Sequence, residues 1–179
     1  MTKPEDVKST AEPEVEWDQM GIAGRAMFFD ASALVKRYLD EPGYEKVRAA
    51  FRAEPTKYTT PFCFYEALSV LKARIGTGAD RARYLHACAD LTAWFGTVQR
   101  SVKDLNFTDH TAFRHAKQIV EKYGLDLSDA FQIVSVQRGF FSVLAGDSAT
   151  ILATADAKLA KAARSEGLLV WPVLDEDRP

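Results

Sequence analysis

The stretch MFFDASALVKRYLDEPG, residues 27–43, joins a short apolar run to an amphipathic segment and places Asp30 where the two meet. Residues 26–29 have the length and composition of a buried strand, and residues 32–40 carry apolar side chains at helical spacing. A charge directly after a buried strand either caps the following helix or belongs to a site at the carboxyl end of the strand. Taken alone, Asp30 is compatible with both interpretations.

The same alternation of strand and helix recurs along the rest of the chain. Further strands are expected within 57–60, 98–108, 150–156 and 168–173, and helices at 42–53, 61–76, 79–96, 109–124, 127–139 and 157–167. Ser128 is a suitable cap for the helix at 127–139, and Thr108 or Asp109 for the helix before it. Apolar strands alternating with helices predict an α/β fold with a central parallel sheet.

Length and composition predict a single domain, because 179 residues with 47% hydrophobic content form one sizeable core. We expect a loosely docked extension at 1–24, the domain at 25–175 and a short tail at 176–179. The 23 basic residues do not exceed the 25 acidic ones, which disfavours tight binding of duplex nucleic acid. A local groove for a short single strand remains compatible with this balance when metal ions neutralise phosphate charge.

The two cysteines and the absence of a membrane span indicate the cytoplasm. Cys63 and Cys88 lie in apolar helical segments without a CxxC pair, so we expect buried, reduced thiols. No apolar run approaches the roughly 18 residues of a membrane span, and the polar, acidic N-terminus is unlike a signal peptide.

Four acidic residues occupy positions that ordinary surface charges avoid. Asp30 and Asp156 end predicted strands, and Asp129 lies in the first turn of the helix at 127–139. Glu66 is almost alone as a charge in the apolar helix at 61–76, where we expect it to be buried and to need a partner such as Arg74 or a cation. Carboxylates that gather in this way repel one another unless a divalent cation lies between them, and oxygen ligands suit Mg²⁺ or Mn²⁺.

The four segments FFDASALVKRYL, FYEALSVL, LSDAFQIVS and ILATADAKLAKAARSEGLLVWPV together resemble the PIN-domain nucleases, especially VapC-type toxins. The resemblance extends from about residue 26 to residue 174, and it is specific because order, spacing and surrounding residue types agree at four places. It implies a three-layer α/β/α fold with the parallel sheet between helices. It also implies an acidic quartet that binds metal and carries catalysis, formed by Asp30, Glu66, Asp129 and Asp156. Ser32 and Thr154 match the hydroxyl positions beside the first and last of these acids.

The resemblance further implies a Mg²⁺-dependent endoribonuclease that acts on RNA, is inhibited by a small cognate antitoxin protein and forms a homodimer. Tyr38, Tyr44 and Phe51 would serve such a dimer interface or equally the core. Three basic residues are candidates for contacts with substrate phosphates, although solvated helix faces explain them as well: Lys36, Arg37 and Lys158.

Two other functions remain open. A metal-dependent phosphatase or phospho-acceptor domain also places aspartates at strand ends, but the residues after Asp30 lack the second aspartate typical of those phosphatases. A non-catalytic PIN-like binding module would be expected to have lost part of its acidic set, and here all four positions are acidic. The segment 139–149 is longer than the usual connection, and Asp126 and Asp147 are interpreted as turn residues. The histidines have no zinc-site spacing and are interpreted as structural.

Overall fold

Four parallel strands form a sheet in the order β2-β1-β3-β4. In the computed structural model, which describes residues 25–54, 56–103, 105–106, 108–144 and 146–178, the strands are β1 (Met27–Phe29), β2 (Lys57–Tyr58), β3 (Ile151–Thr154) and β4 (Leu169–Pro172). The expected extension at 1–24 lies outside the described residues. The register pairs Phe28 with Leu152 and Ala153 with Trp171, so β1 and β3 end side by side. The predicted parallel sheet is confirmed.

Side chains alternate between the two faces of the sheet and build a core on each. Phe28 packs with Leu152 and Val170 on one face, while Met27 and Phe29 pack on the other. This period of two is what a strand buried on both faces requires. The five residues are all buried, so the centre of the sheet has no solvent-exposed face.

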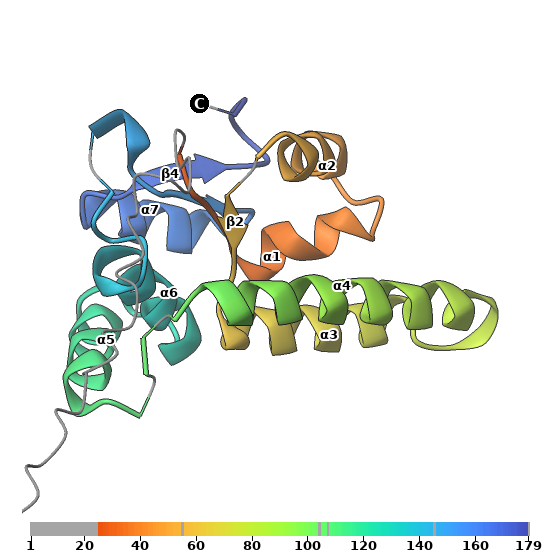
Figure 1. Cartoon of the computed structure of the whole chain (residues 1–179), viewed down its shortest axis with the longest axis horizontal. Coiled ribbons are helices and arrows are strands. Elements are labelled where there is room, and N and C mark those ends of the chain that lie inside the picture. The colour runs from red at the N-terminus through yellow and green to blue at the C-terminus, as the bar shows by residue number, and fades with distance from the viewer. Residues whose placement is uncertain (1–24, 55, 104, 107, 145, 179) are drawn as a thin grey trace, which may run out of the picture.

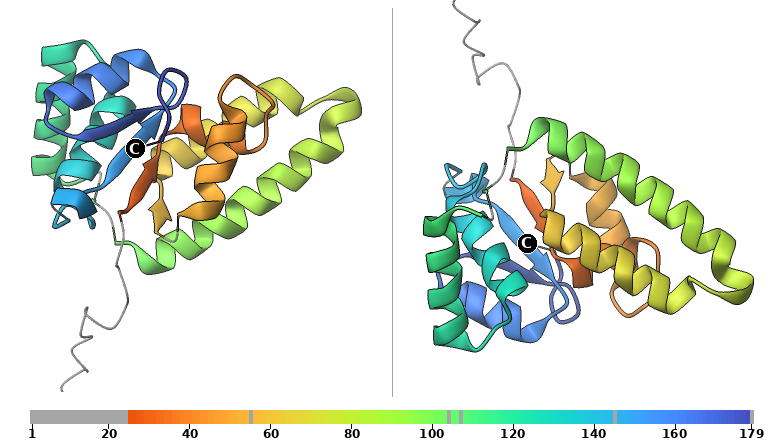
Figure 2. Two further views of the ribbon diagram at one scale, coloured as in Figure 1. Left: turned by 90° about the horizontal axis from the view of Figure 1, so that it is seen from above. Right: turned by 90° about the horizontal axis from the view of Figure 1, so that it is seen from below.

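Helices cover both faces and complete the three layers (Figure 2). On the Met27 face lie α1 (Ala31–Leu34), the 3-10 helix η2 (Val35–Arg37), α2 (Tyr44–Ala53), α3 (Pro61–Ile75), η3 (Gly78–Asp80) and α4 (Arg81–Ser101). On the Phe28 face lie α5 (His110–Tyr123), α6 (Leu127–Arg138) and α7 (Ala157–Ser165), with η4 (Gly146–Ser148) in the connection before β3. The three-layer α/β/α architecture is therefore as expected.

The strand expected within 98–108 is wrong. Helix α4 continues through Gly96 to Ser101, and the described residues from 102 to 108 contain no strand. Leu91, Trp94, Val98 and Val102 continue the helical spacing and all pack into the core, which outweighs the low helix propensity of a single glycine. Helices α3 and α4 thus form a long hairpin that projects from the body of the domain (Figure 1).

Aspartates rather than serine or threonine cap the two helices before β3. Asp109 Oδ1 accepts hydrogen bonds from the backbone N–H of Thr111 and Ala112 at the start of α5. The expected Ser128 cap of α6 is wrong, because Asp126 is the capping residue and accepts the Asp129 N–H at 3.0 Å. Asp126 stands directly before Leu127, the first residue of α6, whereas Ser128 is already inside the helix and cannot be its N-cap.

The segments at the edges of the domain also pack onto it. In the long connection before β3, Phe141 is buried and packs against Tyr58 of β2 with ring centroids 4.7 Å apart. Beyond β4, Arg178 pairs with Glu54, and the Trp171 indole N–H donates to the Glu176 carbonyl at 3.1 Å. Residues 176–178 therefore contact the domain through these side chains and this carbonyl.

The remaining expectations on individual side chains are confirmed only in part. Phe51 belongs to the core, whereas Tyr38 and Tyr44 are half-buried. Cys63 is a buried free thiol as expected, but Cys88 is only half-buried, so its expected burial is wrong in part. Among the described helices, none has the length and apolar character needed to cross a membrane.

Candidate active site

Asp30 is a buried carboxylate held by two hydroxyl groups. It follows the last residue of β1, and its own N–H donates to the Ala153 carbonyl of β3 at 3.0 Å. Its Oδ2 accepts hydrogen bonds from Ser32 Oγ and from Thr154 Oγ1, the latter at 2.7 Å. Burial raises the pKa of Asp30, and the hydrogen bonds from Ser32 and Thr154 oppose that rise. The two hydroxyls thus fix the orientation of this carboxylate and stabilise its charged form.

The same hydroxyls connect Asp30 to the turn after β3. Ser32 Oγ accepts the Ala155 N–H at 2.8 Å, and Thr154 Oγ1 accepts the Asp156 N–H at 3.0 Å. Asp156 in turn caps α7, because its Oδ1 accepts the N–H groups of Lys158 and Leu159 at 2.7 and 2.9 Å. The capping interpretation and the site interpretation of Asp156 are therefore compatible, since only one of its carboxylate oxygens is used by the cap.

Asp129 is a second acid of the group whose pKa the protein raises. It lies half-buried in the first turn of α6, and the buried Gln132 donates from Nε2 to its Oδ1 at 3.3 Å. Burial, followed by the negative charges of Asp126, Asp30, Asp156 and Glu66, raises the pKa of Asp129 to about 7. Asp129 therefore lies within electrostatic reach of four other carboxylates.

Glu66 belongs to the same acidic group but is not buried. The expectation of a buried glutamate is wrong, because Glu66 lies on the exposed side of α3 while its neighbours Phe64 and Ala67 face the core. Arg74, its suggested partner, pairs with Glu41 instead. Partial desolvation raises the pKa of Glu66, and the charges of Asp30, Asp126 and Asp156 raise it further. Glu66 is therefore exposed, but its carboxylate is still subject to the negative charges of the aspartates.

The acidic group has the composition of a divalent-cation site without being a preformed cage. Among the described residues, no Lys or Arg forms a salt bridge with any of the four acids. In the same part of the chain, no three Asp, Glu, His or Cys side chains stand close enough to hold a metal between them. The donors are all hard oxygens, and their mutual repulsion is what a cation would relieve. The residues therefore fit Mg²⁺ or Mn²⁺ once their side chains move together.

The three candidate phosphate contacts have different surroundings. Lys36 is buried and pairs with Glu41 at 3.7 Å, and Arg37 pairs with Asp90 at 2.6 Å while stacking over Phe51. Both side chains are thus engaged outside the acidic group. Lys158, at the start of α7 beside Asp156, is exposed, and its Nζ donates to the Gly124 carbonyl just before α6. Of the three, it is the basic residue adjacent to the acids.

Two residues that sequence reasoning left out contribute to the site. Asp126 was interpreted only as a turn residue, yet its charge is the strongest electrostatic influence on Asp129. Gln132 had no assigned role, although it is fully buried and contacts the Asp129 carboxylate. A signal for both exists in the sequence, because positions three before and three after Asp129 lie on the same helical face as that acid.

Comparison with known proteins agrees with this architecture. A sequence-family profile described as "PIN domain" matches residues 27–177. A chain of the solved structure "Crystal Structure of FitAcB from Neisseria gonorrhoeae" superposes with a TM-score of 0.56 at 14% sequence identity, covering 84% of this chain and 99% of that chain. At that identity the likeness concerns the fold. No curated protein sequence matches the chain.

Proposed function

Because this chain belongs to the PIN domain family, we propose that it is a divalent-metal-dependent endoribonuclease of the VapC toxin type. PIN domains are generally metal-dependent nucleases, and the acidic quartet is present at all four positions where that resemblance requires it. The observation that carries the proposal is the perturbed Asp129, whose pKa of about 7 results from burial and from the other acids at the ends of β1 and β3 and on α3 and α6. Acids that share a site and lack cationic partners are typical of a metal-assisted hydrolase.

In this proposal the quartet of Asp30, Glu66, Asp129 and Asp156 holds Mg²⁺ or Mn²⁺. A bound divalent cation would supply water activation for attack on phosphorus and charge stabilisation at the leaving oxygen of the RNA phosphodiester. Ser32 and Thr154 are positioning residues, because they hold Asp30 Oδ2 in one orientation and favour its ionised form.

Other residues would act on the substrate and on the carboxylate of Asp129. Lys158 would contact a phosphate next to the one that is cleaved, whereas Lys36 and Arg37 would have to leave their ion pairs to do so. Gln132 would keep Asp129 Oδ1 oriented, and Asp129 would release its proton when the cation binds.

The test is cleavage of a panel of labelled single-stranded RNAs by the purified protein with Mg²⁺, with Mn²⁺ and with EDTA. Asp129→Asn is the site variant, and Asp80→Asn is the matched control, since Asp80 is an exposed aspartate in η3 at the tip of the α3–α4 hairpin. We expect cation-dependent cleavage by the wild type and the control, and none by Asp129→Asn. Equal cleavage by Asp129→Asn and wild type would contradict the proposal, because a contaminating nuclease would explain it.

We also propose a small antitoxin protein and a second copy of this chain as partners in the cytoplasm. The α3–α4 hairpin exposes large apolar side chains, with Tyr65 67% and Leu85 52% exposed, which suits a protein contact. Light scattering of the purified chain tests the homodimer, and Leu85→Lys should shift it toward a monomer if the hairpin forms the interface. An unchanged molecular mass of the variant dimer would place the interface elsewhere.

A further inference from the structure

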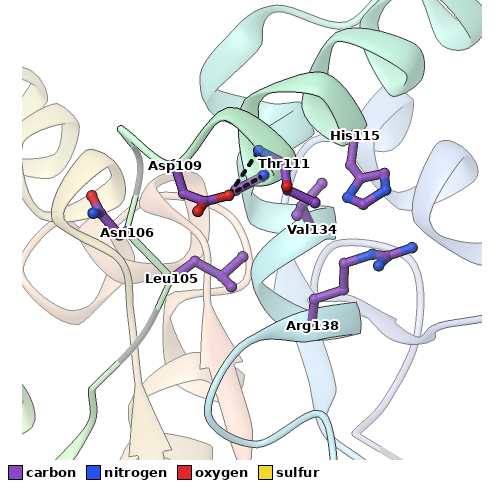
Figure 3. Close-up of a pocket in the computed structure, with 8 residues that line it drawn as sticks. Leu105, Asn106, Asp109, Thr111, His115, Val134 and Arg138 are labelled. Carbon is purple, nitrogen blue, oxygen red and sulfur yellow. Dashed lines mark hydrogen bonds between the residues drawn. The ribbon is translucent and has the colours of Figure 1, made fainter.

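Helices α5 and α6 border a second pocket of about 430 Å³ that the acidic site does not use. It lies toward the end of α6 opposite Asp129, because Arg138 is nine residues further along the helix, a rise of about 13–14 Å. Figure 3 shows the side chains of His115 and Arg138 at one end of this pocket and Asp109 toward the other. Its size is within the range of small-ligand sites, about 300–1,000 Å³.

The His115–Arg138 end of the pocket has unused capacity for an anion. Among the described residues, Arg138 makes no ion pair, and His115 Nδ1 is shielded from solvent without a hydrogen-bond partner. Burial and the positive charges of Arg138 and Arg114 lower the pKa of His115. A bound anion would reverse that electrostatic effect and give Nδ1 a partner, and a guanidinium such as that of Arg138 suits the fork geometry of a phosphate.

The rest of the pocket suits the sugar and base of a nucleotide. Leu105, which is partly buried, supplies an apolar wall against which a flat ring can pack. Asp109 Oδ1 is used by the cap of α5, whereas its Oδ2 has no partner within the described residues. The backbone N–H groups at the start of α5 also lower the pKa of Asp109, so this oxygen is a permanent acceptor for a hydroxyl or amine.

We propose that this pocket binds a phosphorylated ribonucleotide, either free or as one unit of an RNA strand. Arg138 and His115 would hold the phosphate, Leu105 the base, and Asp109 a ribose hydroxyl. Binding there involves no bond cleavage and does not depend on the acidic site. Only the RNA-strand form rests on the proposed function, in which an RNA held at this end of α6 would extend toward Asp129 at the other.

Calorimetric titration of the full chain in EDTA, where metal-dependent cleavage is excluded, tests the proposal. The probes are AMP, UMP, adenosine, inorganic phosphate and a hexanucleotide RNA. Arg138→Gln removes the exposed phosphate ligand, and Arg52→Gln is the matched control, since Arg52 is an exposed arginine on α2 across the sheet. We expect AMP and UMP to bind the wild type more tightly than adenosine or inorganic phosphate does. Their affinity for Arg138→Gln should be at least tenfold lower than for the wild type, and their affinity for Arg52→Gln should be unchanged.

A second readout is the imidazole NMR signal of His115, which should report a raised pKa when AMP is present. Tighter binding of the hexanucleotide than of AMP would identify the RNA strand as the source, and the reverse would identify the free nucleotide. Unchanged AMP and UMP affinity in Arg138→Gln, or equal affinity for AMP and inorganic phosphate, would overturn the proposal. Failure of the nuclease function would appear in the cleavage assay alone, because nucleotide binding in EDTA is independent of it.

Discussion

Replacing Asp129 by asparagine should stabilise the metal-free protein at alkaline pH while removing its response to Mg²⁺. The folded state raises the pKa of this carboxyl from 3.8 to about 7, so folding opposes its ionisation. If the whole difference acted on folding, it would correspond to about 4 kcal/mol. Because Asp129 is only half-buried, solvent screens part of that energy, and we expect a gain of about 1–2 kcal/mol for Asp129→Asn above pH 7.

The sign of the pH dependence follows from proton binding to Asp129. Below about pH 4 the carboxyl is protonated in both states and contributes nothing to stability. Between about pH 4 and 7 the unfolded chain loses this proton while the folded protein keeps it, so the folded state binds more protons and wild-type stability falls as pH rises. The advantage of Asp129→Asn should therefore grow across this window and stay constant above pH 7.

Urea denaturation in EDTA at pH 4.5, 6 and 8.5, repeated with Mg²⁺, measures these effects. Cation at tenfold above its dissociation constant should stabilise the wild type by about 1.4 kcal/mol and the variant by much less. Asp109→Asn is an informative control of opposite sign, because the N–H groups of Thr111 and Ala112 lower the pKa of that carboxyl. If Asp129→Asn were less stable than wild type at pH 8.5, or equally changed at every pH, the electrostatic reasoning would be refuted.

Three further substitutions test a residue that positions Asp30, a residue that contacts the substrate and an ion pair that only stabilises the fold. Thr154→Val removes a hydroxyl donor to Asp30 while keeping its shape, so Mg²⁺ affinity measured by calorimetry should fall about 10–100-fold, and unchanged affinity would exclude a positioning role. Lys158→Met should raise KM for RNA with little change in kcat, whereas an unaltered KM would remove Lys158 from the substrate path. Asp90→Ala breaks the ion pair with Arg37, which contacts none of the four acids, so it should cost about 1 kcal/mol in urea denaturation without changing cleavage, and reduced cleavage by the folded variant would contradict this separation.

The sequence predicted the strands that carry the site because their signals are local. Residues 26–29 and 150–155 are short apolar runs, each followed directly by an aspartate. The prediction failed at 98–108, where Gly96 suggested a helix end, but packing of Val98 and Val102 against the core extends α4. The helical spacing of Leu91, Trp94, Val98 and Val102 is a local sign of this longer helix, and it outweighs the low helix propensity of Gly96.

The exposure of Glu66 could not be predicted from its neighbours, because it depends on which side of α3 the rest of the fold covers. Phe64 and Ala67 face the core, but the side of α3 that carries Glu66 and Tyr65 is left open. The apolar composition of α3 therefore predicted a buried Glu66, whereas this glutamate is exposed. The charges of Asp30 and Asp156 nevertheless raise the pKa of Glu66, and its place in the acidic quartet stays a prediction that rests on the resemblance of all four segments.

The way each acid is stabilised explains how several carboxylates can gather without a cation. Asp126 and Asp156 accept backbone N–H groups at the starts of α6 and α7, and Asp30 accepts two hydroxyl groups, so the fold itself offsets part of their charge. Asp129 has only Gln132 as a donor among the described residues, and it is the acid for which the pKa reaches about 7. The start of α6 is therefore a place where a bound cation would relieve repulsion that the fold itself does not offset.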